Sequence, residues 1–118
     1  MVKISKFWGY LANKDNLEKI ISPPYDVCTV KEAREWTGDN EMFYFHIEKP
    51  AIDVPDDATD EEVALKGKEN LLSFIDKGYL VKDDAERVYI YSQQMGDHIQ
   101  YGIVCLSSVD DYESDKIK

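Results

Sequence analysis

The sequence predicts an α+β fold in which a mixed, mainly antiparallel sheet packs against two principal helices. Two Thr-x-x-Glu capping patterns, Thr29 with Glu32 and Thr59 with Glu62, each stand before a helical run. Two apolar segments, 88–94 and 98–107, are joined through a short turn that contains Gly96, which is typical of a β-hairpin. The length of 118 residues suits a single domain, 1–118.

The first half of the chain predicts strand, turn, helix and strand. Residues 4–11 are rich in aromatic and β-branched side chains, which favours a strand, and residues 13–16 predict a turn. A helix is expected from the Thr29 capping pattern through Trp36, ending near Gly38. Residues 42–47 are apolar and aromatic, and we interpret them as a second strand.

The middle of the chain predicts a loop followed by the longer helix. Residues 50–60 hold two prolines and four aspartates, so we expect a mobile acidic loop there. An acidic metal site is the sharper alternative, but the spacing matches no calcium-loop pattern. The second helix is expected to begin at the Thr59 pattern and to end at Gly78, before a short strand at 79–81.

The last third predicts the hairpin. Alternation places Tyr89 and Tyr91 on one face of the first strand and Val88 and Ile90 on the other. Residues 103–106 are apolar on both faces, so we expect this strand to lie inside the sheet. The polar tail, residues 110–118, is expected to fray.

Composition excludes several classes of partner. Lys and Arg number 14 against 24 for Asp and Glu, so the net charge of −10 disfavours nucleic acid and anionic membrane surfaces. No hydrophobic run reaches transmembrane length, and the N-terminus has no apolar signal region. Cys28 and Cys105 lie far apart without a CxxC motif, which favours reduced cysteines in a cytoplasmic protein.

A proline-rich segment, residues 21–27, is the strongest candidate for a site. Pro23 and Pro24 fix φ at two consecutive positions and remove two backbone donors. The stiff loop that results would display the Tyr25 hydroxyl next to the Asp26 carboxylate. The alternative is a plain corner between two elements, with Tyr25 packed and Asp26 solvated.

These motifs resemble a known family. Phe-Trp-Gly-Tyr at 7–10, residues 17–27 with their Pro-Pro-Tyr-Asp-Val string, and Val-Tyr-Ile-Tyr at 88–91 all have counterparts in it. Gly-Ile-Val-Cys-Leu at 102–106, followed by Asp111 and Tyr112, extends the match over nearly the whole chain. The chain thus resembles a widespread SerK-like family of uncharacterised proteins, related to free serine kinases of the ParB/sulfiredoxin superfamily.

The resemblance implies a ParB/sulfiredoxin-like fold and phosphoryl transfer to a small hydroxyl substrate such as free serine. Asp26 would be the catalytic carboxylate and Tyr25 a neighbouring donor. The segment of Pro23 and Pro24, together with Asn40 and His46, would bind the substrate. The phosphate donor would be ATP, ADP or pyrophosphate with Mg²⁺. For His46, a local hydrogen bond at a strand end is the alternative.

One departure from the family concerns the C-terminus. Family members place a Pro-His-Glu-x-Thr motif directly after the closing strand, where this chain ends at 115–118. We therefore expect an N-terminal fragment whose missing C-terminal segment is its partner, and an isolated chain without activity. The alternative function is a non-catalytic ligand-binding or protein-interaction module in which the exposed hairpin and the acidic loop contact a partner.

Overall fold

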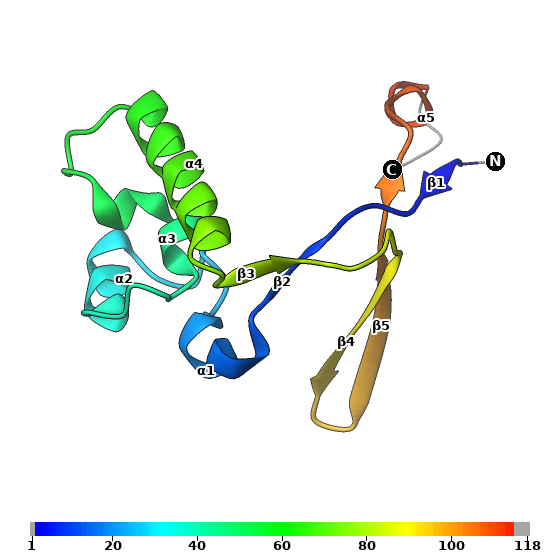
Figure 1. The fold of residues 1–118 in the computed structure, drawn as a ribbon, viewed down its shortest axis with the longest axis horizontal. Coiled ribbons are helices and arrows are strands. Elements are labelled where there is room, and N and C mark those ends of the chain that lie inside the picture. The colour runs from blue at the N-terminus through cyan, green and yellow to red at the C-terminus, as the bar shows by residue number, and fades with distance from the viewer. Residues whose placement is uncertain (1, 115–118) are drawn as a thin grey trace. The chain divides into compact units, whose positions relative to one another are not determined.

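The computed structural model describes residues 2–114, and the chain divides into two compact units (Figure 1). Unit 1 comprises the described residues up to Tyr10 and from Lys82 onward, and unit 2 comprises Leu11–Val81. Helices and small antiparallel sheets are both present, so the α+β prediction is confirmed. The single domain and the ParB/sulfiredoxin-like arrangement stay predictions.

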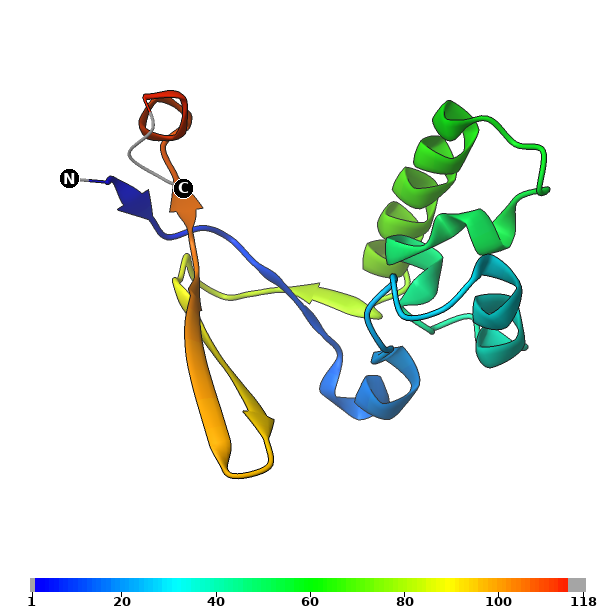
Figure 2. The same cartoon turned by 180° about the vertical axis from the view of Figure 1, so that it is seen from behind.

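Unit 2 is built mainly from helices, which Figure 2 shows from behind. Its longest helix is α4 (Asp60–Asp76), and the second longest is α2 (Val30–Thr37). The shorter segments are η1 (Lys14–Asn16), α1 (Leu17–Ile20), α3 (Phe45–Glu48) and η2 (Pro50–Asp53). Within residues 2–114, none of the helices is both long and apolar enough to cross a membrane.

The predicted helix ends of α2 are confirmed. The Thr29 hydroxyl accepts from the Glu32 backbone N–H at 3.1 Å, and the Glu32 carboxylate accepts from the Thr29 backbone N–H at 3.2 Å. This complete capping box satisfies two backbone donors that a helix start otherwise leaves unpaired. At the other end, Gly38 adopts a φ of 50°, a backbone conformation that side chains with a Cβ rarely adopt.

The core of the molecule lies in unit 2. Phe45 is completely buried, and its ring stacks on Trp36 with centroids 6.4 Å apart and meets Phe43 edge-on at 5.0 Å. Such aromatic pairs stabilise beyond the area that they bury. The apolar side chains buried in the described part of the chain are Ile20, Ala33, Met42, Phe45, Ile52, Phe74 and Leu80.

The predicted strand at 42–47 is wrong. Residues 41–44 form turns, and the helix α3 follows, closed by a hydrogen bond from Lys49 N–H to the Phe45 carbonyl at 2.8 Å. Met42 and Phe45 are both buried, and a spacing of three residues places both on one side of a helical turn. A short apolar run does not by itself distinguish a buried helix from a strand, which explains the error.

The predicted mobile loop at 50–60 is also wrong over its first part. Pro50 opens the 3₁₀ helix η2, and Ile52 is buried against Ala33 and Phe45. Arg34 holds this segment, because its guanidinium donates to the carbonyls of Ile52, Ala51 and Val54 at 3.2, 3.2 and 2.9 Å. One apolar anchor and one arginine therefore order a segment whose composition is mostly polar.

Unit 1 contains short strand pairs at its chain ends. The strand predicted at 4–11 is interrupted: β1 (Ile4–Ser5) pairs with β6 (Leu106–Ser107), and Phe7 forms an isolated bridge with Arg87. The strand β2 (Tyr10–Ala12) pairs instead with β3 (Leu80–Lys82). The eight-residue segment thus changes partner twice, so each of its pieces is short.

The predicted hairpin is confirmed as β4 (Tyr89–Met95) and β5 (His98–Val104), with an antiparallel register in which Tyr91 faces Gly102. A Cβ at Gly102 would lie 2.1 Å from the Tyr91 ring, so the ring occupies the space that only glycine leaves open.

The expectation that residues 103–106 lie inside a sheet is wrong. Within the described chain β5 pairs with β4 alone, and Ile103, Val104 and Leu106 are 62%, 45% and 53% exposed. Their apolar character therefore does not reflect burial by other described residues. This leaves an apolar strand uncovered in unit 1.

The prediction of a frayed tail is wrong for residues 110–113, which lie in the helix α5 (Val109–Glu113). The Ser108 side chain caps this helix, and the buried Asp111 carboxylate accepts from the Lys3 backbone N–H at 2.8 Å. Residues 115–118, the rest of the predicted tail, lie outside the described residues.

A polar cluster ties the hairpin to the rest of unit 1. The Asp83 carboxylate accepts from the Tyr89 hydroxyl at 2.5 Å and from Arg87 Nε at 3.1 Å. The Tyr89 hydrogen bond, helped by those from Asp84 and Arg87, lowers the pKa of Asp83 to about 2 although burial opposes the shift. The same bond to Asp83 raises the pKa of Tyr89.

Candidate functional site

The proline loop displays its two candidate residues at the corners of a turn. The Val27 N–H donates to the Pro24 carbonyl at 3.3 Å, which makes Tyr25 and Asp26 the central pair of a four-residue turn. Both residues are exposed, Tyr25 at 57%, so the alternative of a plain corner is wrong about a packed Tyr25 and right about a solvated Asp26. Pro23 is exposed as well.

Side chains at the end of α3 hold this turn in place. The Lys49 ammonium donates to the carbonyls of Tyr25 and Cys28 at 2.7 and 2.9 Å, and so binds both sides of the turn. At the loop entry, the Ser22 hydroxyl donates to the Glu48 carboxylate at 2.6 Å. Backbone carbonyls held by a charged donor are well fixed, so the Asp26 carboxylate is presented to solvent on an ordered backbone.

The other predicted binding residues, Asn40 and His46, lie close together but not in the turn. His46 Nε2 is 3.0 Å from the Asn40 carbonyl oxygen, and the Asn40 amide donates to the Lys19 carbonyl at 2.8 Å. His46 lies in α3, so the expected strand end is wrong, whereas its local hydrogen bonding is confirmed. The structure therefore separates the predicted residues into the Asp26 turn and the surroundings of His46.

His46 lines a cleft of about 290 Å³ on unit 2, and Pro23, Pro24, Tyr25 and Asp26 are not part of its lining. This volume is near the lower end of the ~300–1,000 Å³ typical of small-molecule sites. The cleft is lined by side chains of α3, η2 and α4 and of the segments on either side of them: Glu41, His46, Asp53, Lys66, Asn70, Ser73, Phe74, Lys77 and Tyr79.

A hydrogen-bonded triad forms one wall of the cleft. Asp53 Oδ2 lies 2.6 Å from His46 Nδ1, and it also accepts from the Asn70 amide at 2.9 Å. The same Asn70 amide donates to the His46 carbonyl at 2.6 Å, which joins α4 to α3. Both ring nitrogens of His46 therefore have an oxygen partner within hydrogen-bond distance, the Asp53 carboxylate and the Asn40 carbonyl.

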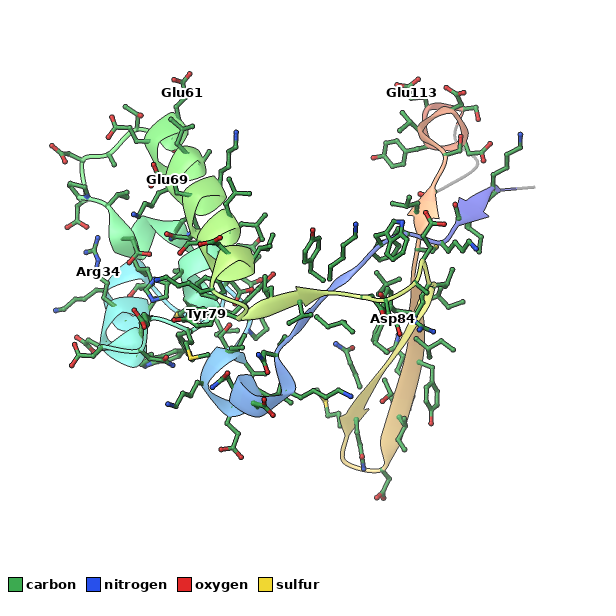
Figure 3. All side chains as sticks on the ribbon, in the orientation of Figure 1. Arg34, Glu61, Glu69, Tyr79, Asp84 and Glu113 are labelled. Carbon is green, nitrogen blue, oxygen red and sulfur yellow. The ribbon has the colours of Figure 1, made fainter. Side chains whose placement is uncertain are left out.

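Tyr79 and Glu41 form another part of the lining, and Figure 3 shows Tyr79 next to the end of α4. The Tyr79 hydroxyl donates to Glu41 Oε1 at 3.1 Å. Burial raises the pKa of Tyr79, and the hydrogen bond to Glu41 and its charge raise it further. Lys77 Nζ lies 5.8 Å from the centre of the Tyr79 ring, within the range of a cation–π contact.

Sequence reasoning missed the contribution of α4 to this cleft. Lys66, Asn70, Ser73 and Lys77 follow one another at spacings of four, three and four residues, which place them on one helical face. That polar stripe is readable in the sequence. The apolar stripe of the same helix already explains how the helix packs, so the sequence alone gives no reason for the polar positions to line a cleft rather than to face solvent.

Two further kinds of site to consider among the side chains of residues 2–114 are a metal site and a reactive thiol. Residues 2–114 contain no group of three or more His, Cys, Asp or Glu side chains that could hold a metal ion. Cys28 and Cys105 are free thiols of intermediate exposure. Cys28 packs against the core cluster of Ala33, Phe45 and Ile52, which is the environment of a structural cysteine.

Comparison with known proteins gives one finding. Comparison with curated proteins and with solved structures finds no match. Residues 4–118 match the family model described as "Protein of unknown function (DUF1015)", which covers nearly all of the chain. The chain therefore belongs to the DUF1015 family of proteins of unknown function.

Proposed function

We propose that this chain provides the acceptor side of phosphoryl transfer to a small hydroxyl compound, of the kind carried out by free serine kinases. The observation that carries the proposal is the exposed Asp26 carboxylate on a turn whose carbonyls are held by Lys49. A carboxylate in this position accepts the hydroxyl proton of an acceptor, and the Tyr25 hydroxyl supplies a neighbouring donor.

The donor side is less well supported by this chain. The sequence has no Walker-type glycine loop, and the described residues contain no acidic cluster for Mg²⁺. The described residues therefore do not fit ATP, ADP or pyrophosphate with Mg²⁺. In this proposal a further segment of a longer natural chain provides the phosphate cradle, and the chain alone is inactive.

The setting of the proposal is a cytoplasmic protein acting on a small molecule rather than on nucleic acid. The net charge of −10 supports the second part, since phosphates of a nucleic acid would be repelled. The wide separation of Cys28 and Cys105 in the sequence, without a CxxC motif, supports the first.

A direct assay tests the proposal. The chain and the whole natural reading frame that contains it would each be mixed with L-serine and with ATP, ADP or pyrophosphate, and O-phosphoserine would be measured. We expect product from the whole reading frame, and we expect Asp26→Asn to abolish it because the amide cannot accept the proton. Asp57→Asn, an exposed acid in another loop, is the matched control and should keep full activity.

Undiminished product from a folded Asp26→Asn protein would contradict the assignment. Absence of product from every combination would favour the second candidate, a non-catalytic ligand-binding or interaction module. The uncovered apolar face of the hairpin supports that candidate: Ile90, Ile99, Tyr101 and Ile103 are 47–76% exposed on one side of β4 and β5.

A further inference from the structure

We propose that the cleft beside α4 binds a small zwitterionic compound, one that carries both an oxyanion and an ammonium group. The site is distinct from the Asp26 turn and does not depend on phosphoryl transfer, because none of the turn residues lines it. The inference rests on which polar groups of the lining already have partners and which do not.

The hydrogen-bonding groups of the triad His46, Asp53 and Asn70 are mostly paired with one another, so this wall of the cleft is expected to be rigid. Both His46 nitrogens and both hydrogen atoms of the Asn70 amide are directed at acceptors. The two donors to Asp53 share one oxygen, Oδ2, which leaves Oδ1 free to accept from a ligand. A rigid wall that keeps one acceptor oxygen free is what recognition of an ammonium group requires.

The α4 wall offers donors instead. The backbone N–H of Lys77 donates to the Ser73 carbonyl at 2.9 Å, whereas its ammonium contacts the face of the Tyr79 ring, 5.8 Å from the centroid. Lys66 lies 3.6 Å from Glu69, too far for a hydrogen bond, and its side chain is 35% exposed. The Ser73 hydroxyl lies between these lysines on the same helical face. The Lys77 ammonium and the Ser73 hydroxyl, about one helical turn apart, suit a carboxylate or a phosphate, whereas Lys66 lies about 16 Å from Lys77 along the helix axis.

Charge balance selects the ligand class. Lys66 and Lys77 line the cleft together with Glu41 and Asp53, so the cleft carries both signs although the whole chain carries −10. An anion alone would meet the two carboxylates, and a cation alone would meet the two ammonium groups. A zwitterion can place each of its charges against the opposite charge, which gives the strong charge-assisted hydrogen bonds without a like-charge contact.

The test is a titration of the ¹⁵N-labelled full chain followed by NMR, with four probes. L-alanine and phosphoethanolamine are zwitterions that carry a carboxylate and a phosphate, respectively. Propanoate and L-alaninamide keep the anionic and the cationic half alone. We expect a zwitterion to shift the backbone amides of His46, Asn70 and Lys77, with at least tenfold weaker binding of the single-charge probes. Whichever zwitterion binds more tightly identifies the oxyanion.

Variants then assign the two charges. Lys77→Gln should weaken zwitterion binding about tenfold by removing one charged donor, and Glu41→Gln should do the same at the ammonium end. Lys68→Gln, on the same helix but outside the lining, is the matched control and should leave affinity unchanged. The proposal is overturned if neither zwitterion shifts the cleft amides, if propanoate binds as tightly as L-alanine, or if Lys68→Gln weakens binding as much as Lys77→Gln.

Discussion

The two units of this protein differ in how far their apolar side chains are buried. Every buried apolar residue of the described chain lies in unit 2, and its aromatic contacts join α2, α3 and α4 to the neighbouring segments. Unit 1 instead leaves Ile90 and Met95 at 76% and 85% exposure on a two-stranded hairpin. An isolated hairpin is at best marginally stable in water. Unit 2 therefore has its own core, whereas unit 1 depends on local polar contacts.

Removing the Phe45 ring at the centre of the unit 2 core should lower the free energy of unfolding more than any other substitution considered. Phe45→Ala removes a completely buried ring that stacks on Trp36 and meets Phe43, and we expect a loss of about 3–5 kcal/mol in the free energy of unfolding. The control in unit 1, Ile90→Ala, should change it by less than about 0.5 kcal/mol because the side chain is exposed. Urea denaturation followed by circular dichroism measures both, and equal losses would contradict the comparison.

Removal of the Arg34 side chain should cause the second largest loss in the free energy of unfolding. Arg34→Ala leaves the carbonyls of Ala51, Ile52 and Val54 without their donor, and we expect a loss of about 1–3 kcal/mol. Asp56→Ala removes only the exposed ion pair at 2.8 Å and should cost no more than about 1 kcal/mol. If both variants lose the same amount in urea denaturation, the ion pair rather than the carbonyl contacts would hold η2.

A smaller effect is expected from a change in the hairpin. Gly102→Ala forces the Tyr91 ring out of its place, and we expect a loss of about 1 kcal/mol together with altered NMR shifts of the Tyr91 ring. In a Tyr91→Ala background, the same glycine substitution should cost almost nothing, because the clash is gone. An unchanged cost in that background would show that the glycine has another role.

The smallest effect is a local pH dependence in unit 1. Since the pKa of Asp83 is lowered to about 2 in the folded chain, its contribution is present above the unfolded value near 3.9 and is lost as the pH falls through the folded pKa. Between about pH 4 and pH 2, NMR should show the Tyr89 hydroxyl losing its acceptor while the α4 amides stay unchanged. Tyr89→Phe should raise the pKa of Asp83 by removing the largest cause of its shift, although the Asp84 and Arg87 hydrogen bonds remain. Tyr91→Phe should leave that pKa unchanged, and NMR titration of the Asp83 carboxyl measures both.

Local signals in the sequence were sufficient for the helix starts and for the hairpin. The Thr29 capping box and the turn at Gly96 act over three or four residues, so no distant partner is needed to identify them. The turn at Tyr25 and Asp26 was foreseen for the same reason, because two prolines restrict the backbone wherever they occur.

What the sequence did not reveal depends on contacts between distant residues. The helix at Phe45 is favoured because its side chain packs against Ala33 and Ile52, and periodicity over six residues cannot show this. The order of η2 comes from Arg34, eighteen positions before the Ile52 carbonyl that it binds. The cleft likewise needs Asn70 of α4 to meet His46 of α3, which only the packed structure brings together.

Native-state hydrogen exchange of the full chain tests the contrast between the units most directly. Amides of α4 around Phe74 should exchange only through opening of the whole core of unit 2, whereas those of β4 and β5 should exchange much faster by local opening. The account predicts clearly higher protection in α4 than in the hairpin. Equal protection of the hairpin and of α4 would contradict it, because it would show that the exposed apolar strands are as firmly held as the core.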